Sequence, residues 1–123
     1  MTAVLVIDDD SSLRNMLTRM LERQTYRVYT AESVEMGLDQ LAQHRDIALV
    51  ITDIVMPGLT GVEGIVEFHK RYPKLPILAM SGGSRTLSKE FSLDSAKLAG
   101  ASAILPKPFT QEGLKLALEK IGV

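Results

Sequence analysis

Short apolar runs alternate along this chain with segments in which apolar residues recur at helical spacing. Runs of this kind, mostly continuous and rich in β-branched side chains, are typical of strands buried inside a parallel sheet. We expect such strands at Ala3–Ile7, Tyr26–Thr30, Ile47–Thr52, Pro76–Met80 and Ser102–Leu105. The second run is more polar than the first, which indicates a place near the edge of the sheet.

Between these runs, apolar residues recur at intervals of three and four and predict amphipathic helices. The residues expected to face the core are Leu13, Met16, Leu17, Met20 and Leu21, then Val34, Leu38 and Leu41, then Val62, Ile65 and Val66, and finally Leu114, Ala117, Leu118 and Ile121. The methionines Met16, Met20, Met36, Met56 and Met80 are expected to fill gaps in the core.

Residues that can cap helices stand where these helices should begin. The capping candidates are Asp10 or Ser11, Ser33 and Thr110. Thr60 and Glu63 match a capping box for the third helix. A further helix, whose start the pattern does not define, should end at Gly100. Five strand–helix units in succession predict an α/β fold with a doubly wound parallel sheet and helices on both faces.

Composition narrows the class of protein. A length of 123 residues indicates one domain, residues 1–123, and 46% hydrophobic with 24% charged residues is ordinary for a globular chain. The net charge of −1 gives no basic footprint, so no direct nucleic-acid binding is expected. The absence of cysteine excludes disulfides and thiolate chemistry.

No apolar stretch approaches the roughly 18 residues of a membrane span, and no basic region of the kind that begins a secretion signal precedes the first apolar run. We therefore expect a cytoplasmic protein without a membrane partner.

Acidic residues follow two of the expected strands. Asp8 and Asp9 come after the first strand and Asp53 after the third. Parallel neighbours lie about 4.8 Å apart, so these carboxylates should meet at the carboxyl end of the sheet, where such folds bind ligands. Two unit charges 4 Å apart repel by about 4 kcal/mol at an effective dielectric constant near 20. The site therefore needs protonated carboxyls or a divalent cation, and hard oxygen ligands alone favour Mg²⁺.

A serine and a lysine follow two later strands. Ser81 stands after the fourth, before Gly82 and Gly83, and Lys107 stands after the fifth. Both could reach the oxygens of a phosphate group that lies beside Mg²⁺. A lone lysine at a strand end is usually a solvated charge, and Ser81 alone could equally be a turn residue. The acidic clusters on the other strands favour the functional interpretation.

In this combination the residues resemble the receiver domain of bacterial two-component response regulators. The resemblance covers the whole chain and rests on Asp8-Asp9, Asp53 with Met56-Pro57, Ser81, and Lys107-Pro108-Phe109, in this order on a (βα)₅ frame. It implies a flavodoxin-like three-layer sandwich with the parallel strand order 2-1-3-4-5.

The same resemblance implies roles for the acidic residues. Asp53 would accept a phosphoryl group from a histidine kinase or a phosphotransfer protein. Asp9, Asp53 and the carbonyl of Val55 would bind Mg²⁺ directly, and Asp8 would hold a metal-bound water. Such a domain is a switch rather than an enzyme with a separate substrate, although it assists its own phosphorylation and dephosphorylation.

Roles for the remaining residues follow from the family as well. Lys107 would pair with Asp53 and then with the phosphoryl oxygens, Ser81 would hydrogen-bond the phosphoryl group, and the Lys107–Pro108 peptide would be cis. Ile104 stands where many receivers have an aromatic switch residue. We therefore expect that Ser81 and its loop transmit the effect of phosphorylation to the output surface. The long segment Ser84–Ser92 would lie beside the expected output surface, formed by the fourth helix, the fifth strand and the fifth helix.

Three interpretations remain open. The favoured one is a stand-alone receiver without an output domain, acting through a downstream protein. The second is a phosphatase of the haloacid-dehalogenase type, with Asp8 as nucleophile and Asp10 two residues on. That family would need an acidic pair after Lys107 and a cap insertion, which the chain lacks, and it leaves Asp53 without a role. The third is a constitutive interaction module that is never phosphorylated, and the complete acidic pocket argues against it.

Overall fold

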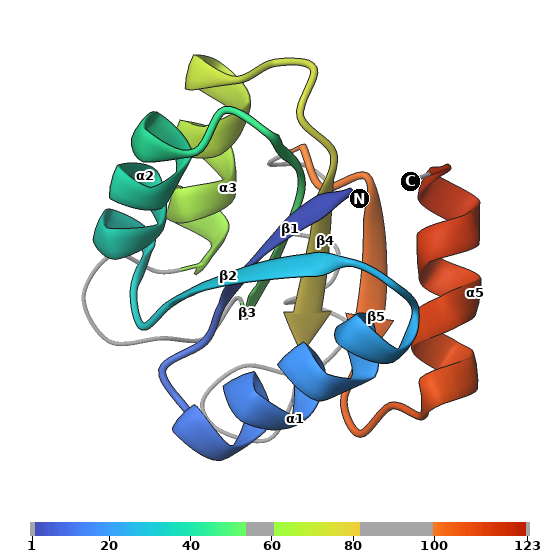
Figure 1. Cartoon of the computed structure of the whole chain (residues 1–123). Helices are drawn as coiled ribbons and strands as arrows, with labels where there is room; N and C mark the ends of the chain where they lie inside the picture. Colours follow the sequence, from blue (N-terminus) through green and yellow to red (C-terminus); the bar gives the residue numbers. More distant parts are fainter. Residues whose placement is uncertain (1, 54–60, 82–99, 123) are drawn as a thin grey trace.

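The computed structural model describes residues 2–53, 61–81 and 100–122 (Figure 1). The strands are β1 (Ala3–Ile7), β2 (Arg27–Ala31), β3 (Ile47–Asp53), β4 (Ile77–Ser81) and β5 (Ala103–Pro106). The helices are α1 (Ser11–Arg23), α2 (Val34–Gln43), α3 (Gly61–Arg71) and α5 (Gln111–Ile121). The helix expected to end at Gly100, the segment Ser84–Ser92, and the residues Met56 and Thr60 lie outside the described residues.

All five strands are parallel and form one sheet in the order β2-β1-β3-β4-β5. This confirms the expected fold class and strand order. It also confirms that the second strand lies at an edge. In the part of the chain that the structure describes, no helix is long and apolar enough to cross a bilayer.

Helices cover both faces of the sheet, with α2 and α3 on one side and α1 and α5 on the other (Figure 1). Alternate residues of β1 point to opposite layers: Leu5 and Ile7 belong to the core cluster that includes Val34 of α2, whereas Val4 and Val6 belong to the cluster that includes Leu17 of α1. Every residue of β1 is fully buried. The strand is apolar throughout because neither of its faces meets water.

Three helices begin where their capping residues predict. The Asp10 side chain accepts hydrogen bonds from the backbone of Ser12 and Leu13. Ser33 caps α2 and Thr110 caps α5 in the same way. Strand limits differ from the expected ones by a residue or so: the second strand is Arg27–Ala31 rather than Tyr26–Thr30.

Some of the expected core positions are wrong. Met16, Met36 and Val66 are 44%, 49% and 48% exposed, respectively. In α3 the buried face is set by Ile65 and Phe68, three residues apart, and Val66 lies about 100° around the helix from Ile65. Met16 and Met36 likewise fall outside the stripes that α1 and α2 bury. An apolar side chain on a helix is therefore no proof of burial.

Two helical glycines allow close packing beneath the end of β1. A Cβ atom at Gly37 of α2 would lie 2.5 Å from the Cδ1 atom of Ile7, and one at Gly64 of α3 would lie 2.6 Å from a methyl group of Val34. Glycine lowers helix propensity by about 1 kcal/mol relative to alanine. Here it lets α2 press against Ile7, the residue that precedes Asp8.

Candidate functional site

The acidic residues meet at the carboxyl ends of β1 and β3. Ile7 pairs with Thr52 in the sheet register, so the next residues, Asp8 and Asp53, emerge side by side. Asp8 is 0% exposed and Asp53 is 4% exposed, whereas Asp9 is exposed. Each of the three carboxylates offers an oxygen within 4.8 Å of the others. The sequence thus predicted this cluster correctly from strand ends alone.

Lys107 brings a positive charge to this cluster. Its Nζ atom lies 3.1 Å from Oδ2 of Asp53 and 3.3 Å from Oδ2 of Asp8. The Lys107 side chain is 20% exposed, so the ion pairs lie largely out of water. The peptide between Lys107 and Pro108 is cis, as the family resemblance implied.

A network of local hydrogen bonds shapes the turn that carries Asp8. The carboxylate of Asp8 accepts a hydrogen bond of 2.9 Å from the backbone N–H of Asp10. The guanidinium of Arg14, one turn into α1, donates a hydrogen bond of 2.7 Å to the backbone carbonyl of Asp8. Sequence reasoning assigned Arg14 no role, because a bond to a backbone carbonyl leaves no mark in the pattern of residue types. The network holds the Asp8 backbone and carboxylate from two sides.

Burial raises the pKa of Asp8 above its ordinary value of 3.8. Loss of water around the carboxylate is the main cause, and the nearby charge of Asp53 adds to it. The hydrogen bond from Asp10 and the charge of Lys107 act in the opposite direction without cancelling the effect. Negative charge at Asp8 is therefore unfavourable in the metal-free fold, and a divalent cation would offset that cost.

The donor set fits Mg²⁺. The clustered ligand atoms are carboxylate oxygens alone, which Mg²⁺ prefers, and the chain has no cysteine that could favour a softer metal. The carbonyl of Val55, the third expected protein ligand, lies outside the described residues. Ser81 ends β4 and pairs with Pro106 in the register, which places its backbone beside the residue before Lys107. Its side chain is also outside the described part.

Asp10 takes part in helix capping rather than in the acidic cluster. Its carboxylate accepts hydrogen bonds of 2.9 Å and 3.3 Å from the first turn of α1. A phosphatase with Asp8 as nucleophile would need this second acid at the reacting centre. The observed geometry therefore argues against the haloacid-dehalogenase interpretation.

Comparison with known sequences agrees with this geometry. The family model described as the response regulator receiver domain matches residues 4–119. A putative two-component response regulator of Arabidopsis thaliana, ARR21, is 37% identical over 106 residues, which cover 85% of this chain and 16% of the plant protein. The response regulator MprA of Mycobacterium avium is 37% identical over 111 residues, which cover 90% of this chain and 46% of MprA. The chain thus spans less than half the length of these relatives.

Solved structures share the whole fold. A response regulator receiver domain protein from Clostridium thermocellum superposes with a TM-score of 0.89 and 30% identity, over 98% of this chain and 94% of that one. The chemotaxis response regulator CheY4 of Vibrio cholerae superposes with a TM-score of 0.86 and 29% identity, over 98% of both chains.

Proposed function

Because this chain belongs to the response regulator receiver domain family, and is thus a phosphoacceptor domain of two-component signalling, we propose that Asp53 is the residue that accepts the phosphoryl group. One observation carries the assignment. Asp53 belongs to the acidic cluster, and its Oδ2 atom lies 3.1 Å from the Lys107 ammonium. Asp8 shares these contacts, but it is fully buried and its carboxylate is also held by the backbone of Asp10.

The transfer step is a displacement at phosphorus. A carboxylate oxygen of Asp53 forms a bond to the phosphorus atom, and the phosphorus–nitrogen bond of a phosphohistidine donor breaks. The histidine leaves with the electron pair and takes up a proton. Such reactions depend on positioning and on stabilisation of charge more than on covalent help from the protein. The proposed donor is a histidine kinase or a phosphotransfer protein.

Each neighbouring residue has a proposed part in this step. Lys107 orients Asp53 before transfer and pairs with a phosphoryl oxygen afterwards. Asp9 and Asp53, with the Val55 carbonyl, are the proposed direct ligands of Mg²⁺, and Asp8 would hold a water molecule of the ion's coordination shell. When bound, Mg²⁺ supplies positive charge to the phosphoryl oxygens. Ser81 donates a hydrogen bond to the phosphoryl group once it is on Asp53.

The output is proposed to be a protein contact that differs between the two states. A downstream protein would bind beside β5 and α5, on the surface to which the expected fourth helix belongs. Ile104 of β5 is partly buried and packs against the core cluster that includes Ile77 and Ala79. It has no aromatic ring to turn inward, so the change at the site is expected to pass through Ser81 and the chain that follows it.

The assignment is tested by locating the phosphoryl group. The protein is treated with radiolabelled acetyl phosphate and MgCl₂, and the label is mapped by peptide mass spectrometry. We expect label on Asp53, and we expect Asp53→Asn to lose it. Label on Asp8 would support the phosphatase interpretation instead, and no label on the wild-type protein would support the unphosphorylated interaction module.

A further inference from the structure

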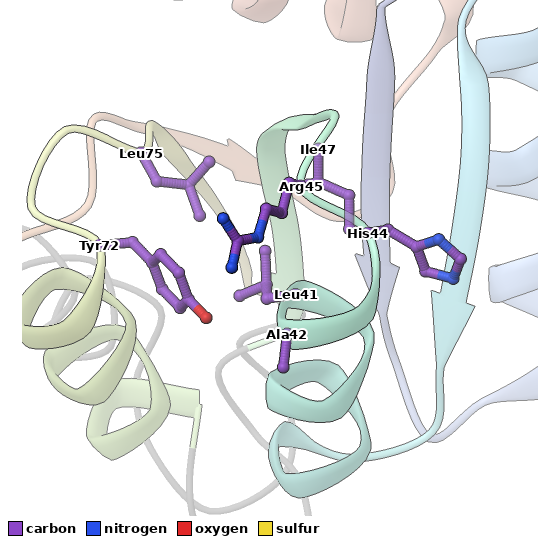
Figure 2. A pocket seen from close by; sticks show the side chains of 7 residues that line it. All are labelled: Leu41, Ala42, His44, Arg45, Ile47, Tyr72 and Leu75. Atoms are coloured by element: carbon purple, nitrogen blue, oxygen red, sulfur yellow. The ribbon is translucent and has the colours of Figure 1, made fainter.

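A hollow lies at the opposite end of the strands, where β3 begins. We call it the amino-end hollow, and it is lined by Leu41, Ala42, His44, Arg45, Ile47, Tyr72 and Leu75 (Figure 2). These residues come from the end of α2, the turn into β3 and the chain that follows α3. Its volume of about 440 Å³ is within the range of small-molecule sites.

The apolar part of the wall is anchored in the core. Leu41 and Ile47 are 5% and 8% exposed and belong to the core cluster on the α2–α3 face of the sheet. Tyr72 and Leu75 are partly buried and pack against the same cluster. The hollow is therefore shaped by residues that the fold already holds in place, which is the usual form of a ligand site.

Arg45 is the charged group that faces this space. Figure 2 shows its guanidinium between the end of α2 and the side chains of Tyr72 and Leu75. Its neighbours turn toward β2 instead: the ring of His44 stacks on Tyr29 at 4.0 Å, and Asp46 pairs with Arg27. Across residues 2–53, 61–81 and 100–122, Arg45 makes no side-chain hydrogen bond or ion pair. Its donors remain available to a ligand.

Two further basic residues lie close to the hollow. A neighbouring hollow of about 520 Å³ shares Ile47, Tyr72 and Leu75 with the first and adds Lys74 and Arg71, among others. Arg71 is paired with Glu67 at 2.7 Å, whereas Lys74 has no side-chain partner among the described residues. Lys74 is therefore a positive charge close to the hollow that is not part of its lining.

We propose that the amino-end hollow binds a small organic acid, that is, a carboxylate carried on an aromatic or branched aliphatic body. The guanidinium of Arg45 offers two parallel N–H donors, which match the two oxygens of a carboxylate. The apolar body packs against Leu41, Ile47, Tyr72 and Leu75. A single cation set among apolar walls suits a monoanion better than a strongly hydrated phosphate dianion. The proposal does not rest on phosphoryl transfer to Asp53.

The proposal is tested by NMR titration of the full chain with two matched probes, 3-phenylpropionate and its neutral analogue 3-phenylpropionamide. We expect saturable shifts of the Tyr72 and Leu75 amides with the acid, and binding of the amide weaker by about tenfold or more. Arg45→Gln should weaken binding of the acid by about tenfold. Arg45→Lys should weaken it by less, because lysine keeps the positive charge but lacks the paired N–H donors of the guanidinium.

Lys74→Gln is the matched control, because it removes one positive charge from the neighbouring hollow. It should change the affinity by less than about twofold, since an exposed charge outside the hollow is screened by salt. Arg45 is exposed, so the variants should unfold like the wild type. A capped acidic tripeptide, acetyl-Glu-Phe-Glu-amide, tests whether the carboxylate comes from a partner protein.

Four results would overturn the proposal. They are the absence of saturable shifts at Tyr72 and Leu75, equal affinity for acid and amide, equal losses from Arg45→Gln and Lys74→Gln, and tighter binding of the tripeptide than of 3-phenylpropionate. Equal losses from the two variants would mean that the acid responds only to the overall positive charge at this end. Tighter binding of the tripeptide would mean that the hollow binds a carboxylate of a partner protein.

Discussion

The two ends of one sheet treat charge in opposite ways. At the carboxyl end, Asp8 and Asp53 are buried and share the ammonium of Lys107. At the amino end the buried surface is apolar and the charges stay in water: Arg27 and Asp46 pair at 3.7 Å with 58% and 45% of their side chains exposed. The same strands carry both ends, so the difference lies in the residues that follow or precede each strand.

This difference shows that the carboxyl end of the sheet holds its acidic residues at a cost in folding free energy. Burial of a carboxylate is unfavourable unless a partner compensates, and the raised pKa of Asp8 shows that compensation is incomplete without metal. The amino end carries no such cost, because its ions remain hydrated. Folding alone does not explain the acidic cluster, whereas the proposed phosphoryl transfer with Mg²⁺ would explain it.

The largest effect is expected from removal of the shared cation. Lys107→Met removes the ammonium group that the two buried carboxylates share and should lower the free energy of unfolding by about 1–3 kcal/mol in metal-free buffer. The loss stays below that of a fully buried pair because Lys107 is 20% exposed. Urea unfolding with and without MgCl₂ measures it, and Mg²⁺ should stabilise the variant more than the wild type.

Lys115→Met is the control for that experiment, since Lys115 is an exposed residue of α5. Its effect should be within about 0.5 kcal/mol. Equal losses for the two lysines would contradict the idea that the carboxyl end depends on a compensated charge.

The next effect concerns the shape of the acidic turn. Arg14→Met removes the hydrogen bond to the Asp8 carbonyl and should weaken Mg²⁺ binding by about tenfold, as loss of a supporting contact does at other metal sites. An argument from charge alone predicts tighter Mg²⁺ binding instead, because Arg14→Met removes a positive charge that repels the metal ion. Isothermal titration calorimetry separates the two, with Arg19→Met as an exposed control on the same helix. Tighter binding by the Arg14 variant would show that Arg14 acts only through its charge.

A substitution of Asp8 itself is expected to have a smaller effect, and to stabilise the metal-free protein rather than destabilise it. Asp8→Asn should raise the stability of the metal-free protein at neutral pH, because asparagine resembles the protonated form that burial favours. The sign follows from linkage. The folded pKa is raised, so the folded state binds more protons than the unfolded one between 3.8 and the raised value, and this group's contribution to stability falls as pH rises through that window.

The advantage of Asp8→Asn over the wild type should therefore grow as pH rises above about 3.8 and then level off. Urea unfolding of both proteins across this range without metal measures the difference. Added Mg²⁺ should reverse the ranking, since the variant lacks one charge of the cluster. An advantage that does not vary with pH would rule out ionisation of Asp8 as its cause.

Features that depend on residue type and spacing were the predictable part of this molecule. The buried strands were predictable because both faces of β1 are apolar, and the site was predictable because Asp8, Asp53 and Lys107 each lie at or just after the carboxyl end of a strand. The buried faces of the helices were only partly predicted. Val66 follows Ile65 directly and is equally apolar, and only the position of α3 against the sheet decides which of them is buried.

Other features arise from packing and have no signature in the pattern. The amino-end hollow combines Leu41 from α2 with Tyr72 and Leu75 from beyond α3. These segments are far apart in sequence, and each shows only ordinary apolar residues. The orientation of Arg45, opposite to that of His44 and Asp46, depends on how the turn between α2 and β3 is built, which composition does not specify.

The smallest effect is expected for the surface ion pair at the amino end. Asp46→Asn removes the charge that faces Arg27 and keeps an acceptor for the Tyr29 hydroxyl, which lies 3.4 Å from Asp46. It should lower the free energy of unfolding by no more than about 0.5 kcal/mol, less still in high salt, because water already solvates both partners. The measurement is the same urea series used for Lys107→Met, at two salt concentrations. If the two substitutions cost the same, burial is not what distinguishes the charged groups at the two ends, and the electrostatic argument for the acidic site loses its basis.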